Sequence, residues 1–123
     1  MDYEAELGFF VSQSLPMGKT IAADEAKDYI FGFVVLNDWS ARDVQFTEMT
    51  PLGPFNGKGF ATSISPWVTT LDALEGARCA PSGLDLRGGG STLAPHLRHG
   101  DENPTWNLEF EVSVFSEFSC RTH

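Results

Sequence analysis

The sequence predicts an α+β domain that is mainly β-structure, because three segments have the side-chain pattern of strands and the segments between them favour loops and short helices. Residues 3–11 begin by alternating apolar and acidic side chains, which is typical of a half-buried strand. Residues 31–36 form a nearly unbroken apolar run, which favours a strand buried on both faces. Residues 106–115 alternate throughout and form the clearest predicted strand.

Two short helices are expected between these strands. Residues 12–20 contain a proline and a glycine and should form a loop. Residues 22–29 follow it and are rich in helix formers. Ser40 stands three residues before Asp43, which resembles a capping box. The second helical turn is therefore expected over residues 41–48.

The rest of the chain is predicted from its glycines and prolines. Residues 51–59 hold three glycines and two prolines and should form a shaped loop that could line a site. Residues 60–68 have strand-like chemistry, whereas residues 76–105 have no clear period and are expected to be an irregular loop. No internal repeat is visible, so residues 1–123 are expected to belong to a single domain.

Composition restricts the function classes. The chain is 41% hydrophobic and 20% charged, as in globular proteins. Its net charge of −9 disfavours nucleic acid and anionic lipid surfaces as partners. No apolar run approaches the roughly 20 residues that span a bilayer, and the opening residues do not resemble a secretory signal. Cys79 and Cys120 are too few for a disulfide framework or a zinc site, so a cytoplasmic location is expected.

Three carboxylates are candidate metal ligands. Glu4 and Glu6 are two apart, so on a strand they project from one face, roughly 7 Å apart at the backbone, and can share a cation. A solvated strand face is the competing interpretation. Asp38 ends an apolar run, where its charge requires either a cation or the backbone amides of the next helix. Carboxylate oxygens suit Mg²⁺ or Ca²⁺ better than zinc.

Three polar donors follow Asp38 in the chain. Arg42 and Gln45 are three apart, hence on one side of a helical turn, and Lys58 lies in the glycine-rich loop. Together they could stabilise an oxyanion or hold a substrate carboxylate, although each alone would pass for an ordinary surface residue. The histidines are expected to be solvated loop residues rather than general bases: His96, His99 and His123.

Four motifs resemble a known family. They are D-Y-E-A-E-L-G-F-F at residues 2–10, N-D-W-S-A-R-D-V-Q at 37–45, P-L-G-P-F-N-G-K at 51–58 and S-I-S-P-W-V at 63–68. Together they closely resemble the fumarylacetoacetase family, most clearly over residues 1–75. The resemblance implies a fragment of that family's catalytic domain, a mixed β-sheet roll.

The resemblance also implies roles for individual residues. The positions matched to the metal site are Glu4, Glu6, Asp38, Lys58 and Thr62, with Mg²⁺ or Ca²⁺ as the ion. An ammonium group cannot ligate a cation, so Lys58 would act through its carbonyl or as an oxyanion donor. Arg42 and Gln45 match substrate-contacting positions and, with Lys58, would stabilise negative charge. Met49 stands where the family has a substrate-contacting tyrosine.

The activity implied by the resemblance is metal-dependent hydrolysis of a β-diketone, in which fumarylacetoacetate gives fumarate and acetoacetate at the end of tyrosine and phenylalanine degradation. A small diketo acid would be the partner, and a homodimer the assembly. The family's water-activating histidine matches no residue here, so a partial domain is expected that is inactive alone. The alternatives are an acylpyruvate hydrolase, a 2-oxo acid decarboxylase or a non-catalytic metal-binding fragment.

Overall fold

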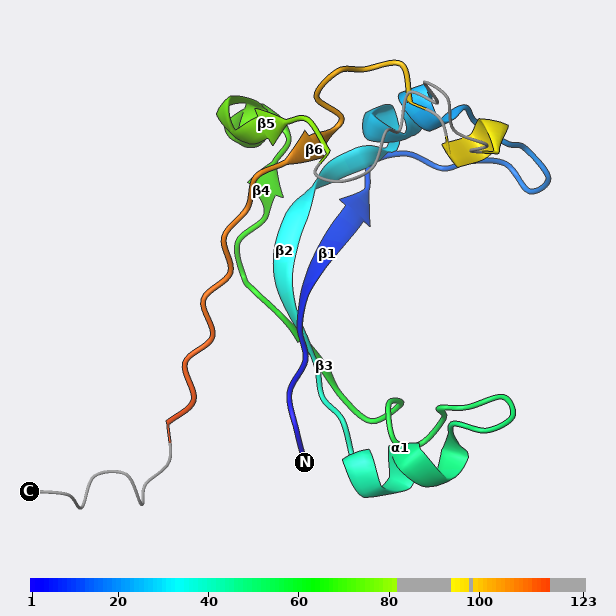
Figure 1. Cartoon of the computed structure of the whole chain (residues 1–123), viewed down its shortest axis with the longest axis vertical. Coiled ribbons are helices and arrows are strands. Elements are labelled where there is room, and N and C mark those ends of the chain that lie inside the picture. Colours follow the sequence, from blue (N-terminus) through cyan, green and yellow to red (C-terminus); the bar gives the residue numbers. More distant parts are fainter. Residues whose placement is uncertain (82–93, 98, 116–123) are drawn as a thin grey trace, which may run out of the picture.

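The computed structural model describes residues 1–81, 94–97 and 99–115, and its framework is a long antiparallel hairpin with short elements at both ends (Figure 1). The strands are β1 (Ala5–Val11), β2 (Ile30–Asp38), β3 (Thr62–Ile64), β4 (Thr69–Thr70), β5 (Arg78–Cys79) and β6 (Thr105–Trp106). The helical elements are η1 (Ala23–Tyr29), α1 (Arg42–Glu48), η2 (Asp72–Ala77) and η3 (Pro95–Leu97). A mainly β architecture with few helices is thereby confirmed for the described residues.

Strand β2 is the centre of the larger sheet. It pairs with β1 along one edge, from Ala5 opposite Asn37 to Val11 opposite Ile30. Its other edge pairs with β3 near its end and with β4 near its start. The close approach of β4 explains Gly32, since a Cβ there would lie 2.6 Å from the Thr69 carbonyl oxygen. Strands β5 and β6 form a separate antiparallel pair.

The core is small in the described part of the chain. Phe33 and Val34 are the buried apolar side chains there. The Phe33 ring makes edge-on contacts with Phe9 and Trp106, at centroid distances of 6.5 and 5.2 Å. The prediction that β2 is buried on both faces is only partly right, because Val35 is 55% exposed.

The strand predicted over residues 106–115 is wrong for most of its length. Only Trp106 belongs to a strand, β6, and Asn107 donates its N–H to the Ala77 carbonyl at 2.8 Å. Residues 108–115 run extended beside the larger sheet without joining it (Figure 1). An alternating pattern decides which side chains share a face, but a strand also needs a neighbouring backbone at hydrogen-bonding distance.

The predicted helices are confirmed in position, although not in every detail. Residues 23–29 form a 3₁₀ helix, and α1 covers the segment expected after Ser40. The capping box is wrong, because the residue before α1 is Ala41 and it makes no side-chain cap. The Ser40 side chain is instead fully buried and donates to the Asp38 carbonyl at 3.1 Å.

Residues 60–68 and 76–105 also depart from their predictions. The first segment holds only the three residues of β3. The second, expected to be irregular, contains β5, η3 and the start of β6, while residues 82–93 and 98 lie outside the described residues. Cys120 and His123 lie outside them too. Among the residues described, no helix is long and apolar enough to cross a membrane.

Candidate metal and substrate site

The three candidate carboxylates meet at one end of the hairpin. Each of Glu4, Glu6 and Asp38 offers an oxygen, and these oxygens all lie within 4.8 Å of one another. Strand pairing causes this convergence: Asp38, at the end of β2, donates its N–H to the Glu4 carbonyl at 3.1 Å. Glu4 and Glu6 then share a face because they are two residues apart. The grouping predicted from the sequence is therefore present.

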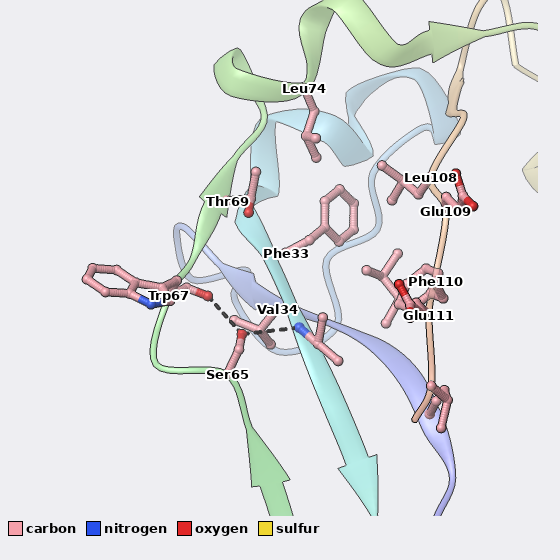
Figure 2. Close-up of a pocket in the computed structure, with 14 residues that line it drawn as sticks. Phe33, Val34, Ser65, Trp67, Thr69, Leu74, Leu108, Glu109, Phe110 and Glu111 are labelled. Atoms are coloured by element: carbon pink, nitrogen blue, oxygen red, sulfur yellow. Dashed lines mark hydrogen bonds between the residues drawn. The ribbon is translucent and has the colours of Figure 1, made fainter. Parts of the chain in front are cut away.

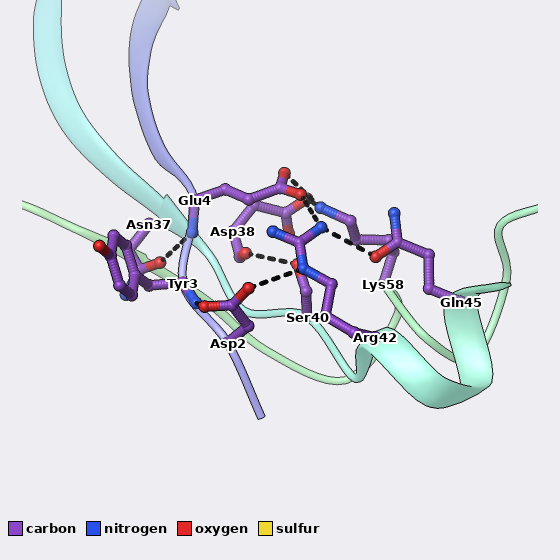
Figure 3. A network of polar contacts seen from close by, with 9 residues as sticks. All are labelled: Asp2, Tyr3, Glu4, Asn37, Asp38, Ser40, Arg42, Gln45 and Lys58. Carbon is purple, nitrogen blue, oxygen red and sulfur yellow. Dashed lines mark hydrogen bonds and ion pairs between the residues drawn. The ribbon is translucent and has the colours of Figure 1, made fainter.

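Two cations lie against this cluster (Figure 3). The Lys58 ammonium contacts the Glu4 carboxylate and lies 2.9 Å from Asp38 Oδ2. Arg42 Nη1 lies 2.5 Å from Glu4 Oε1 and 3.0 Å from Gln45 Oε1, and its Nε lies 2.8 Å from Asp2 Oδ2. The positive groups come from α1 and the following loop, whereas the negative groups come from the strands and the residues just before β1.

The ion pairs favour the charged forms of Asp2, Glu4 and Lys58. Hydrogen bonds from Lys58, and then from Arg42, lower the pKa of Glu4 below its ordinary value. Desolvation lowers the pKa of Lys58, but hydrogen bonds to Glu4 and Asp38 outweigh it and leave that pKa raised. A hydrogen bond from Arg42 lowers the pKa of Asp2. Asp2 and Glu4 are therefore anionic at neutral pH.

The donor set fits a hard divalent cation. Oxygens on opposite sides of a bound Ca²⁺ lie about 4.6–5.2 Å apart, since each bond is about 2.3–2.6 Å long, and the cluster meets this limit. Four carboxylates, counting Asp2, face two cationic side chains. The residual charge of −2 is the charge that one divalent ion would neutralise. The residues present thus fit a hard divalent cation.

The remaining predicted residues lie around this cluster. Thr62 sits opposite Asp38 in the β2–β3 register. Gln45 lies one turn into α1, with its side-chain oxygen on Arg42. Met49 caps the far end of α1, where its N–H donates to the Gln45 carbonyl at 3.0 Å and its side chain is about half exposed.

Two residues of the site were missed from the sequence. Asp2 binds Arg42 and pairs with Ser40 in an isolated bridge. Its position was detectable, because Asp2, Glu4 and Glu6 continue one period-two series along a strand. Glu48 accepts the N–H groups of residues 55, 56 and 57 at 2.9, 3.1 and 3.0 Å. No spacing rule indicates such a contact, because it depends on the fold of the loop.

Loop 51–59 packs directly on α1. The Gly57 carbonyl accepts the N–H of Ala41 at 2.9 Å, and Gly57 is buried. A Cβ at Gly57 would lie 2.7 Å from the Gln45 Cα, so only glycine permits this approach. Loop 51–59 therefore lies beside the carboxylates, since Lys58 follows Gly57 and reaches Asp38.

His96 belongs to η3, and η3 lies near the end of the hairpin opposite α1 (Figure 1). His96 is exposed, as predicted. The prediction of a solvated side chain is wrong for His99, which is 17% exposed and has its Nδ1 3.1 Å from Asp24 Oδ1. This contact joins the segment after η3 to η1.

An apolar groove of about 410 Å³ lies on the other part of the sheet (Figure 2). Phe33, Val34 and Leu74 form one side, and Leu108 and Phe110 from the extended segment form another. None of the three carboxylates lines this groove. The groove is lined mainly by apolar side chains and holds none of the candidate metal ligands.

Known proteins are similar to this chain over most of its length. The family described as fumarylacetoacetate (FAA) hydrolase C-terminal matches residues 1–114. Fumarylacetoacetase fahA of Aspergillus fumigatus is 51% identical over 93% of this chain, and fumarylacetoacetase of Bos taurus is 53% identical over 95%. Fumarylacetoacetase of Homo sapiens is 41% identical over 95%. The chain spans about a quarter of these relatives, 26% in each case.

Proposed function

Because the chain belongs to the fumarylacetoacetate hydrolase family, we propose that it supplies metal ligands and charge-stabilising groups for hydrolytic carbon–carbon cleavage of fumarylacetoacetate. The products would be fumarate and acetoacetate, at the end of tyrosine and phenylalanine degradation. The observation that carries this proposal is the convergence of Glu4, Glu6 and Asp38 beside Lys58 and Arg42.

The carboxylates Glu4, Glu6 and Asp38 would hold Mg²⁺ or Ca²⁺. Their mutual distances and the residual negative charge support this assignment. Thr62 would lie near the ion, because it sits opposite Asp38 in the β2–β3 register. When bound, the cation supplies Lewis-acid polarisation of the diketone carbonyls.

Lys58, Arg42 and Gln45 would stabilise the negative charge that develops during cleavage. Water adds to the carbonyl that becomes a carboxylate of fumarate, and the other fragment leaves as the enolate of acetoacetate before it takes up a proton. The Lys58 ammonium lies within hydrogen-bonding reach of the carboxylate cluster, so it can donate to an oxyanion formed there. Arg42, which Asp2 and Gln45 hold in orientation, would bind a substrate carboxylate.

Met49 would border the substrate. Its place at the end of α1, one turn after Gln45, supports this assignment. A thioether cannot donate a hydrogen bond as a tyrosine hydroxyl does, so this side of the substrate would be held by apolar contact. The family also supports a mixed β-sheet roll as the complete domain, a homodimer as the assembly and the cytoplasm as the location.

The metal site is tested by calorimetric titration of Mg²⁺ or Ca²⁺ into the protein expressed from its own gene. Asp38→Ala should abolish saturable binding of Mg²⁺ and Ca²⁺, whereas Asp43→Ala, an exposed acid on α1, should bind as the parent does. Equal metal binding by Asp38→Ala and the parent would refute the assignment of Asp38 as a ligand. Turnover is tested by the appearance of fumarate from fumarylacetoacetate. Exclusive cleavage of an acylpyruvate, or decarboxylation of a 2-oxo acid, would refute the proposed substrate.

A further inference from the structure

The loop that carries Lys58 is held by a single carboxylate. Glu48, the last residue of α1, accepts three consecutive backbone N–H groups of this loop. Its Oε2 takes those of Phe55 and Gly57 at 2.9 and 3.0 Å, and its Oε1 takes that of Asn56 at 3.1 Å. Charge-assisted hydrogen bonds of this kind are stronger than those between neutral groups.

From this geometry we infer that Glu48 is a positioning residue for Lys58, and that it sets where the ammonium group meets the carboxylate cluster. The inference rests on the proposed function, because it assigns Glu48 to the charge stabilisation ascribed to Lys58. Glu48 makes none of the hydrogen bonds of the Lys58 ammonium itself, which go to Glu4 and Asp38. Its effect therefore passes through the backbone of the loop.

Glu48 and Lys58 are connected through the backbone of residues 55–58. Gly57, held by Glu48, is bonded to the next residue, Lys58. The N–H of Lys58 donates to the Phe55 carbonyl at 3.1 Å, which closes a turn within the segment that Glu48 holds. Gly57 also packs on the backbone of Gln45, and its carbonyl accepts the N–H of Ala41. The loop is thus fixed to α1 at both ends of the helix.

The chemistry of Glu48 suits this role. Its pKa is lowered by the backbone N–H groups of Gly57, then of Phe55 and Asn56, so it is ionised at neutral pH. A glutamine has the same shape but presents one N–H₂ group where a carboxylate oxygen accepts. Two donors would then face each other, and part of the three-bond arrangement would be lost.

The first experiment measures kinetics of Glu48→Gln in the protein expressed from its own gene. The value of kcat should fall by roughly 10- to 100-fold, as expected for a misplaced charge-stabilising group, with KM nearly unchanged. Asp43→Asn removes the same charge from the same helix and should keep the parent kcat. In a Lys58→Met background, Glu48→Gln should cost nothing further. A full additional loss in that background would overturn the inference.

A second experiment does not need turnover. Acylation of each lysine by a soluble ester, measured by peptide mass spectrometry, should proceed several-fold faster at Lys58 in Glu48→Gln than in the parent, with Lys19 and Lys27 unchanged as internal controls. Equal rates at Lys58 in both proteins would overturn the inference. If the protein expressed from its own gene cleaves no β-diketone, the proposed function fails, but the acylation rates still decide the role of Glu48.

Discussion

Substituting Gly57 by alanine should displace Lys58 and slow the proposed hydrolysis. A Cβ at position 57 would lie 2.7 Å from both the Cα and the N of Gln45. Both atoms belong to the backbone of α1 and cannot rotate away as the end of a side chain would. The loop must therefore retreat.

The size of the retreat follows from the contact distances. Ordinary contact begins at 3.4 Å, so the loop has to move by about 0.7 Å. Carried to the next residue, this displacement would lengthen the 2.9 Å contact between Lys58 Nζ and Asp38 to about 3.6 Å, which is beyond a hydrogen bond. Misplacement by about 1 Å can cost two orders of magnitude in rate, so we expect kcat to fall about 10- to 100-fold.

The assay is steady-state release of fumarate, with thermal melting as a check of folding. Gly76→Ala is the matched control, because a Cβ at Gly76 meets nothing within 4 Å, and it should keep the parent kcat. If Gly57→Ala folds and keeps kcat within about twofold, the lysine side chain absorbs the displacement. The reasoning that Lys58 must be fixed through its backbone is then wrong.

Two further predictions concern stability. Phe33→Ala removes the most enclosed aromatic ring of the hairpin and should lower the free energy of unfolding by about 3–5 kcal/mol in urea titration. Phe46 is 74% exposed, so Phe46→Ala should change the free energy of unfolding by less than about 0.5 kcal/mol. Similar losses in the two variants would refute the assignment of Phe33 to the core. Glu48 has a folded-state pKa below its ordinary 4.5, lowered first by the N–H of Gly57, so its stabilisation is present above pH 4.5 and lost as the pH falls through the lowered value. Amide exchange at residues 55–57, corrected for its intrinsic pH dependence, should show this loss in the parent and not in Glu48→Gln.

Much of the fold was predictable because its central elements have strong local patterns. The apolar run at residues 31–36 lies within β2, and the alternation at residues 3–11 marks β1. Their antiparallel register then brings Asp38 to Glu4. Side-chain periodicity specifies faces, and antiparallel pairing turns shared faces into a site.

The errors have a common physical cause, which is that local patterns do not specify distant partners. Residues 108–115 alternate well but do not join a sheet in the described structure. Ser40 has the spacing of a helix cap, yet tertiary burial directs its hydroxyl to the Asp38 carbonyl. In both cases the sequence favours a local structure that the surrounding contacts override.

The site was predicted unevenly for the same reason. Glu4, Glu6 and Asp38 were candidates because two of them share a strand period and the third ends a strand, and the family resemblance favoured metal ligation over a solvated strand face. Glu48 was missed, because its partners are backbone N–H groups of a loop seven to nine residues away. Backbone donors have no side-chain signature, so a carboxylate that binds them resembles any exposed acid in the sequence.

The role proposed for Lys58 can be separated from the proposed metal binding, because the candidate site has two mechanically different parts. The carboxylates lie on or beside strands that are paired along their length, whereas Lys58 depends on the loop that Glu48 and Gly57 hold. If the lysine acts through its ammonium group, Gly57→Ala should lower kcat and leave the affinity for Mg²⁺ or Ca²⁺ within about twofold in calorimetry. If its carbonyl were a ligand, the same displacement would weaken metal binding too. The contact of Nζ with Asp38 favours the first outcome, and a parallel loss of affinity and kcat would contradict it.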